Sequence, residues 1–285
     1  MSALFGPAGL PEGFPGKSSV QAPGWLASIG LDAFEYQCGK GVNVGEKTAR
    51  AVGAAAREHN IRLSLHAPYF INLANPAPES LEKTTGYILS ACRAADWMGA
   101  TRVTIHTGAL MKRTRREALE IAMLSLQEVM RTCDGEGYGH LTLCPETMGK
   151  INQLGDLDEV LELCQLDERL LPCVDFGHLY ARSLGADEGE EATGRILDRI
   201  QSQLGEERAS RFHSHFSQIA FTQNGGEKAH LTFDQEEFGP DYRPLMRQLA
   251  RRGWSPTIIC ESAGTQDKDA LTMKRAYEQD QEEET

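Results

Sequence analysis

The sequence predicts a single (β/α)8 barrel over residues 1–277. Short apolar runs typical of buried parallel strands alternate eight times with longer runs typical of helices. The chain has 285 residues, and a barrel of this kind needs roughly 250 as one domain. The main alternative is an open doubly wound sheet. It is disfavoured because the Gly-x-Gly-x-x-Gly pattern of dinucleotide-binding folds does not follow the early strands.

The strands are predicted from short apolar runs, several of which end in a polar residue. The sixth is typical: Leu171–Asp175 is mostly apolar, and a loop carrying Gly177 and His178 is expected beyond it. The predicted strands are residues 3–9, 31–37, 61–66, 102–106, 141–146, 171–175, 212–216 and 257–261.

The helices are predicted from apolar residues at helical spacing and from end signals. Ser80 and Asp156 are typical N-caps, and Gly253 stands where a helix is expected to stop. The predicted helices are residues 19–30, 45–60, 78–99, 114–132, 156–164, 194–204, 240–252 and 267–278.

Composition and charge restrict the class of protein. The chain is 40% hydrophobic and 25% charged, and its runs of apolar residues are too short to span a membrane. The N-terminus lacks the pattern of a secretion signal, and the seven cysteines form no Cys-x-x-Cys pair, so we expect a cytoplasmic protein with buried thiols and no membrane partner. We also expect a monomer.

The net charge of -12 opposes non-specific binding to nucleic acid. Five of the acids lie in residues 278–285, which we expect to form a solvated, disordered tail. A basic cluster follows the fourth strand, where its side chains either contact phosphates or, as we prefer, form a solvated first helical turn. This cluster consists of Lys112, Arg113, Arg115 and Arg116.

Six metal-ligand side chains end strands three to eight. In a barrel these strand ends meet in one mouth, where active sites lie. Imidazole and carboxylate suit zinc, with manganese or iron as alternatives, and three converging carboxylates would repel each other without cations. Six ligands exceed the requirement of one ion, so we expect at least two metals. The six residues are His66, His106, Glu146, Asp175, His215 and Glu261.

Several motifs resemble those of the endonuclease IV group, AP endonuclease family 2, within the xylose isomerase-like barrels. Leu65-His-Ala-Pro-Tyr-Phe-Ile-Asn-Leu73 is similar to the family's His-x-x-Tyr-x-Ile-Asn-Leu stretch. Later motifs follow in the family's order. They are Ile105-His-Thr-Gly, Pro145-Glu-Thr-Met-Gly-Lys-Ile-Asn-Gln-Leu-Gly155, Asp175-Phe-Gly-His178 and Cys260-Glu-Ser. The resemblance spans about residues 61 to 265 and implies the barrel already predicted.

The resemblance implies a ligand set for two or three zinc ions. His66, His106 and Glu146 would hold the first, and Glu146 would bridge to a second on Asp175, His215 and Glu261. A third would take His178 and the histidine of an Asp-x-His pair, here His230. In this sequence Lys228 stands where the family has the aspartate of that pair. The third site is therefore empty, or the adjacent Glu227 completes it, or the positive charge of Lys228 takes the place of the third metal ion.

The resemblance also implies an activity: hydrolysis of DNA on the 5′ side of abasic sites by a metal-bridging hydroxide. Glu146 and Glu261 would be catalytic, the latter accepting a proton, and Lys228 would contact substrate. Tyr69 matches a DNA-inserting tyrosine, or it is an aromatic lid over the mouth. The acidic charge and the short loop at residues 39–45, which lacks the family's Arg-bearing insertion, count against DNA.

Two other functions remain open. A sugar isomerase or epimerase of the same superfamily would use divalent metal on mainly carboxylate ligands and act on a small phosphorylated or sugar substrate. The three histidines among the six ligands favour the nuclease. A non-catalytic metal-binding barrel is disfavoured because clustered buried charges carry a cost that function usually explains. His213 is expected to point to the opposite side of its strand from His215 and to be structural.

Overall fold

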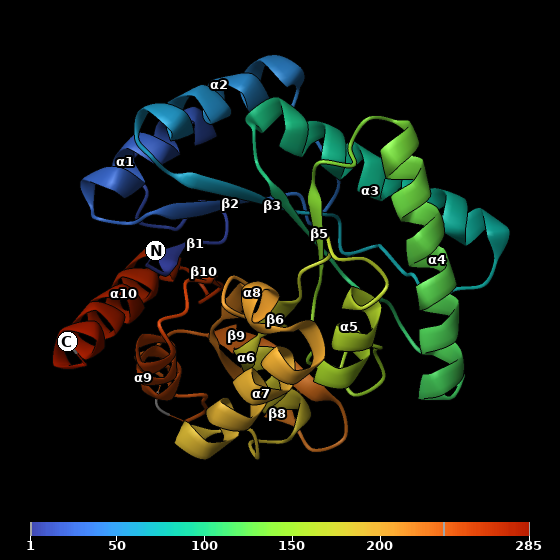
Figure 1. Ribbon diagram of the computed structural model, residues 1–285. Helices are drawn as coiled ribbons and strands as arrows, with labels where there is room; N and C mark the ends of the chain where they lie inside the picture. Colours follow the sequence, from blue (N-terminus) through green and yellow to red (C-terminus); the bar gives the residue numbers. More distant parts are fainter. Residues whose placement is uncertain (1, 236, 285) are drawn as a thin grey trace.

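The computed structural model describes residues 2–235 and 237–284 and shows a closed barrel (Figure 1). Its eight parallel strands alternate with helices along the chain, which confirms the predicted fold class. The barrel strands are β1 (Leu4–Pro7), β2 (Ala33–Gln37), β3 (Arg62–His66), β4 (Arg102–Ile105), β5 (Thr142–Pro145), β6 (Cys173–Asp175), β7 (His213–Phe216) and β10 (Thr257–Cys260).

Two parallel four-stranded sheets make up the barrel wall, in the orders β1-β10-β7-β6 and β2-β3-β4-β5. Single parallel bridges join them at both seams, Ala8 with Glu35 and Glu146 with Cys173. All strands therefore run the same way around the wall, and their carboxyl ends meet at one mouth.

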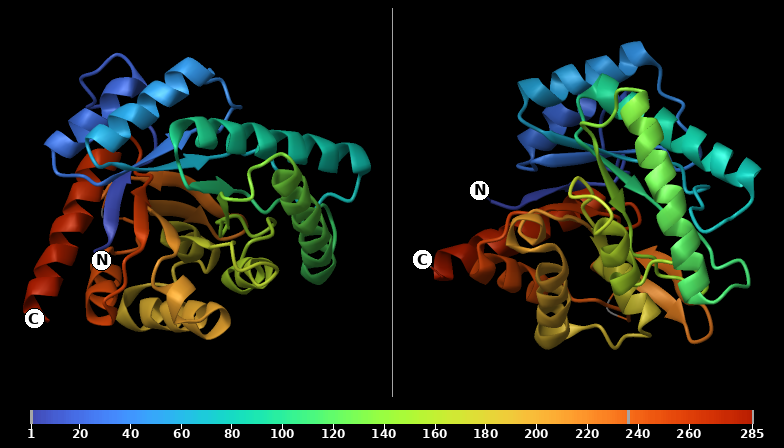
Figure 2. Two further views of the ribbon diagram at one scale, coloured as in Figure 1. Left: turned by 45° about the horizontal axis from the view of Figure 1, so that its top comes forward. Right: turned by 45° about the vertical axis from the view of Figure 1, so that its right-hand side comes forward.

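Helices form the outer layer around the strands (Figure 2). Capping boxes start two of them, at Thr114 and at the predicted cap Asp156. The long third helix begins at Pro78, and its N-cap is Ala77 and not the predicted Ser80. The helices are α1 (Ala22–Ser28), preceded by the 3-10 turn η1 (Ser19–Gln21), α2 (Glu46–Glu58), α3 (Pro78–Met98), α4 (Arg115–Gly135), α5 (Leu157–Cys164), α6 (Phe176–Arg182), α7 (Gly189–Leu204), α8 (Glu206–Ala209), α9 (Arg243–Arg252) and α10 (Gln266–Glu283).

An antiparallel hairpin interrupts the expected alternation after β7. Its strands are β8 (Gln218–Thr222) and β9 (Gly226–Leu231), and the turn between them contains Asn224-Gly225. Asn-Gly is a strong hairpin signal, so this element was recognisable in the sequence but was not predicted. Backbone contacts join it to the segment after β5, through Lys150 with Gly226.

Side chains alternate along each barrel strand, so that apolar residues face the helices and polar residues face the inside of the barrel. Outward residues such as Phe34, Leu65 and Val103 pack into the main core between strands and helices. Inward residues include Glu35 and Thr104, both fully buried. The barrel interior therefore contains polar groups that must satisfy one another.

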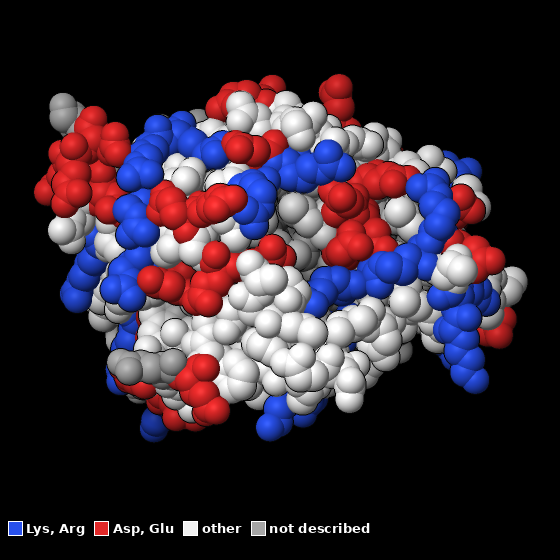
Figure 3. Space-filling view, turned by 90° about the horizontal axis from the view of Figure 1, so that it is seen from below, with Lys and Arg blue, Asp and Glu red and all other residues white. Residues whose placement is uncertain are grey.

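The C-terminal segment differs from its prediction. α10 continues to Glu283, and Glu284 pairs with Arg251 on α9, so residues 278–283 are helical rather than disordered. Acidic side chains gather at the end of the molecule where α10 finishes, whereas both charge signs mix over the rest of this face (Figure 3). The seven cysteines are buried and unpaired, as expected. Among the described residues, no helix combines the length and apolar character needed to cross a membrane.

Candidate metal centre

Glu146 lies at the centre of the side chains that meet in the mouth. Its Oε2 atom is 3.3 Å from Nε2 of both His66 and His106. Its Oε1 atom is 3.2 Å from Nδ1 of His215 and 3.5 Å from Nδ1 of His178. The two oxygens of one carboxylate thus face different groups of imidazoles, as a bridging ligand requires.

A second group of ligand atoms shares Glu146. One such atom each from Glu146, Asp175, His215 and Glu261 lies within 4.8 Å of the others. Asp175 Oδ1 caps α6 by accepting a hydrogen bond from the His178 amide at 2.7 Å. Its Oδ2 atom is buried and accepts no hydrogen bond from any described residue. Asp175 is therefore a helix cap whose second oxygen, 3.4 Å from His178 Nδ1, is left without a hydrogen bond.

A third group joins α6 to the hairpin. His178, which lies in the first turn of α6 rather than in a loop, has Nε2 3.6 Å from Glu227 Oε2, and His230 completes the cluster. Glu227 and not Lys228 occupies the third position, because Lys228 points away as an exposed residue of β9. Gly149 permits this approach, since a Cβ there would lie 2.7 Å from Glu227 Cβ.

The charges in the mouth strongly perturb one another. Burial alone would raise the pKa of Glu146, but His215, His106 and His66 outweigh it and hold the pKa well below its usual value. Burial opposes protonation of His66 and His178, yet neighbouring carboxylates raise both pKa values to about 9. Burial, assisted by Glu261, raises the pKa of Asp175.

This donor set fits divalent metal ions. Imidazole nitrogens and carboxylate oxygens are the ligands of zinc, manganese and iron, and the unbonded Asp175 Oδ2 atom is a buried acceptor that a cation would satisfy. Without cations, protons on the imidazoles must balance the carboxylates. The geometry brings together all eight predicted ligands, in three adjacent groups that share Glu146 or border on it.

The mouth is a cavity of about 310 Å³. Tyr69 borders it from the loop after β3, is 46% exposed and packs on Phe70 with ring centroids 4.8 Å apart. The lining also includes Gln37, Lys150 and Gln153, none of which was predicted as a site residue. Lys228 is not among the described residues that line it, so its predicted substrate contact lacks this support.

Two arginines hold the mouth segment that carries Lys150 and Gln153. Arg182 donates to the carbonyl oxygens of Met148 at 2.9 Å, Lys150 at 3.0 Å and Gln153 at 3.2 Å. Arg115 donates to the Gln153 carbonyl at 3.2 Å and pairs with Glu159 on α5. Arg115 is thus neither a phosphate ligand nor a freely solvated side chain, because it anchors this segment to α5.

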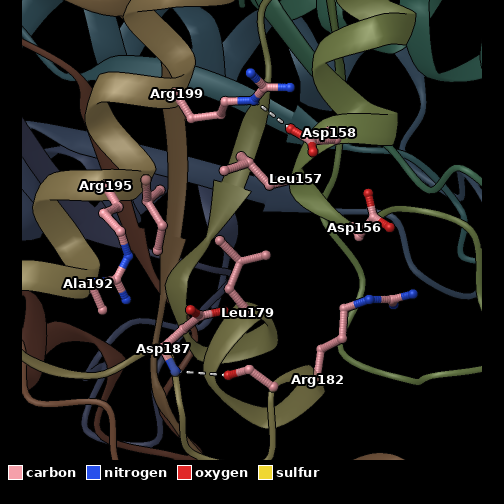
Figure 4. A pocket seen from close by; sticks show the side chains of 11 residues that line it. Asp156, Leu157, Asp158, Leu179, Arg182, Asp187, Ala192, Arg195 and Arg199 are labelled. Carbon is pink, nitrogen blue, oxygen red and sulfur yellow. Dashed lines mark hydrogen bonds and ion pairs between the residues drawn. The ribbon is translucent and has the colours of Figure 1, made fainter.

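A larger cavity, of about 410 Å³, lies outside the mouth between α5, α6 and α7. Figure 4 shows Arg182, Arg195 and Arg199 around it, with Arg199 paired to Asp158. Metal-ligand histidines are absent from its described lining. Its three arginines already contact protein groups.

Glu35 was missed entirely, and His213 was placed wrongly. Residues two apart on a strand face the same side, so His213 points inward like His215, with ring centroids 5.5 Å apart. His213 Nε2 contacts Glu35 Oε2 at 2.9 Å beneath the candidate metal ligands. The signal for Glu35 was an acid at an inward position between Phe34 and Tyr36.

Comparison with known proteins identifies the family. The xylose isomerase-like TIM barrel family matches residues 23–282. The chain belongs to this family. The uncharacterised protein MJ0133 of Methanocaldococcus jannaschii is 31% identical over 274 residues, covering 96% of both chains. The "Probable endonuclease 4" of Mycoplasma pneumoniae is 28% identical, over 52% of this chain and 51% of that protein.

Solved structures support the same fold. Endonuclease IV from Thermus thermophilus aligns over 98% of this chain and 99% of that chain, with a TM-score of 0.68 and 19% identity. A D-tagatose 3-epimerase-like protein aligns over 93% and 96%, with a TM-score of 0.69 and 18% identity. This barrel is therefore similar to both nucleases and epimerases, and the fold does not choose between them.

Proposed function

We propose that this protein is a metal-dependent phosphodiester hydrolase that cuts DNA on the 5′ side of abasic sites. One observation carries the proposal: Glu146 presents one oxygen to His66 and His106 and the other to His215 and His178. A carboxylate shared in this way suits two adjacent cations, and phosphodiester hydrolysis commonly uses such a pair.

The mouth residues have distinct roles in this proposal. Divalent cations bound there would polarise the scissile phosphate and supply an activated water. Glu146 holds the two ligand groups in register. Glu261, partly exposed at the mouth, accepts a proton from the attacking water. Lys150, an exposed cation at the rim, attracts the phosphate backbone, and Tyr69 stacks on an unpaired base or sugar.

The relatives add support to this proposal. A curated relative carries the name endonuclease 4, and the match covers about half of its length. The number of ligand groups, three, also favours the nuclease, because a site built for one sugar-bound metal needs fewer ligands.

The decisive assay uses a labelled duplex with one abasic site. Purified protein loaded with zinc or manganese is expected to nick the strand 5′ to the site, and EDTA is expected to stop the reaction. Glu146→Gln should lower the nicking rate by at least about 1,000-fold, since it removes the ligand shared by both metals. Lys268→Gln, an exposed change on α10, serves as the control. Metal-loaded protein that leaves the duplex intact would refute the proposal.

A sugar epimerase is the second candidate. The mouth is small, the net charge is -12 and the loop between β2 and α2 is short, all of which suit a small substrate better than a duplex. The same preparations should therefore be offered ketohexoses and ketopentoses. Metal-dependent exchange of the sugar's C–H proton with deuterated solvent, without nicking, would replace the hydrolase by an epimerase.

A further inference from the structure

Glu35 is a buried carboxylate inside the barrel, below the mouth. It is 0% exposed and lies on β2, far from solvent. Its Oε2 atom accepts hydrogen bonds from Ser64 Oγ at 3.0 Å and Thr104 Oγ1 at 3.2 Å. The same oxygen is 2.9 Å from His213 Nε2. A charge removed from water in this way is costly unless it is fully paired, and three strands supply those partners.

His213 is a donor in this network. Its Nδ1 atom is 3.5 Å from Arg102 Nη1, and a guanidinium can only donate. Nδ1 therefore accepts, and Nε2 carries the proton that faces Glu35. All three contacts to Oε2 are thus donors, so this oxygen is held firmly in one place.

The other oxygen of Glu35 faces the mouth. Oε1 accepts from Gln37 Nε2 at 3.0 Å and lies 2.9 Å from Nε2 of His215. The contact with His215 is an ion-pair contact rather than an aligned hydrogen bond. A negatively charged carboxylate oxygen at this distance favours a proton on Nε2 of His215.

The opposite nitrogen of His215 faces the metal ligands. Nδ1 lies 3.2 Å from Glu146 Oε1, in hydrogen-bond geometry, and 3.6 Å from Glu261 Oε1, so a cation bound there would take the place of an Nδ1 proton. With the proton kept on Nε2, the Nδ1 lone pair is available to a cation between these carboxylates. A partner on the far nitrogen of a ligating histidine commonly selects its tautomer and orientation.

We propose that Glu35 is a positioning residue that fixes His215 as an Nδ1 metal ligand. The inference rests on the metal centre of the proposed function. It is independent of the substrate, and it assigns a role to a residue outside the eight predicted ligands. Glu35 is not among the described residues that line the mouth. It acts through His215.

Glu35→Gln is the matched perturbation, because it keeps the shape and removes one acceptor. Three donors face the Oε2 position, so the amide oxygen belongs there. The amide NH2 must then face His215 Nε2, which becomes an acceptor, and the proton moves to Nδ1. We expect one metal equivalent to bind about 10- to 100-fold more weakly, with the remaining equivalents unchanged.

Metal binding is measured by calorimetry with zinc and manganese and by elemental analysis after dialysis. Ser64→Ala is the control, because it removes a donor to the same carboxylate but leaves Oε1 facing His215. It should keep wild-type affinity within about twofold. Equal losses in the two variants would mean that packing alone explains the effect, and the inference would fail.

A direct readout does not depend on whether the variants fold. Long-range ¹H–¹⁵N spectra of zinc-loaded, histidine-labelled wild-type protein should show His215 with a protonated Nε2 and a metal-bound Nδ1. A spectrum with Nε2 bound to metal overturns this inference and leaves the metal centre standing. Wild-type protein that binds no divalent metal overturns the proposed function together with this inference.

Discussion

Arg182 anchors the mouth segment. Its replacement should therefore lower the free energy of unfolding far more than replacement of the neighbouring Arg195. Both Arg182 and Arg195 line the cavity in Figure 4. Arg182 donates to three backbone carbonyls, whereas the one ion pair of Arg195 with a described residue is that with the exposed Glu191, one turn away on α7. Arg182→Met and Arg195→Met both keep an apolar stem, so the comparison isolates the guanidinium contacts.

The size of the destabilisation by Arg182→Met depends on which carbonyl oxygens keep another hydrogen-bond donor. The Gln153 carbonyl keeps Arg115, and the Lys150 carbonyl keeps the Gln153 amide. The buried Met148 carbonyl loses the Arg182 donor, and a buried unsatisfied group costs about 1–3 kcal/mol. With the weakened contacts at the other two, Arg182→Met should lower the free energy of unfolding by about 2–4 kcal/mol. An exposed pair four residues apart is worth about 0.3–0.5 kcal/mol, which limits Arg195→Met.

Urea denaturation followed by circular dichroism measures both free energies of unfolding. The slope of the unfolding free energy with urea should be the same for both variants. Because the loosened segment carries Lys150 and Gln153, Arg182→Met should also raise KM more than it lowers kcat. The reasoning is refuted if the two variants differ by less than about 0.5 kcal/mol.

Three further results are expected. Gly6→Ala should lower the free energy of unfolding by about 3 kcal/mol or more, because its Cβ would lie 1.8 Å from a β2 carbonyl oxygen. Gly86→Ala on α3 meets open space and should raise that free energy by about 0.5–1 kcal/mol. Thermal melts that give equal stabilities for the two variants would contradict this. Gly149→Ala should remove one metal equivalent, because its Cβ would lie 2.9 Å from His178 Cδ2; unchanged stoichiometry by elemental analysis contradicts it. Metal-free protein should lose thermal stability as pH rises from 6.5 through 9. Because the pKa values of His66 and His178 are raised in the folded state, that state binds the imidazole protons more tightly than the unfolded state does. A melting temperature that does not change with pH would contradict this.

Much of the site was predictable because it depends on local pattern and on one rule of the fold. Most of the ligands at strand ends follow an apolar run, although His215 follows His213 and Ser214, and the barrel brings all the strand ends to one mouth. The sequence left the third site open between Glu227 and Lys228, and only the hairpin decided it, because it places Glu227 beside His178. A hairpin register is set by its turn and its bulge, and this one has a shift between Ala220 and Phe221.

The helix ends likewise differ in whether local sequence or a distant contact determines them. Asp156 was recognisable as a cap because its contact with the Glu159 amide lies within one turn. The predicted disorder after residue 277 was wrong over residues 278–283, because α10 packs beside α9 and Arg251 pairs with Glu284. The acidic composition of the segment does not reveal that partner on another helix.

The sequence by itself determined the (β/α)8 class and the ligand types at the strand ends, because both depend on periodicity along short stretches of chain. Only the tertiary structure decided which oxygen of Glu146 faces which histidine, that Glu35 lies beneath His215, and that Glu227 reaches His178. These contacts join residues that lie far apart in the chain, on different strands and helices, and they arise from strand register and barrel closure. No local pattern contains that information.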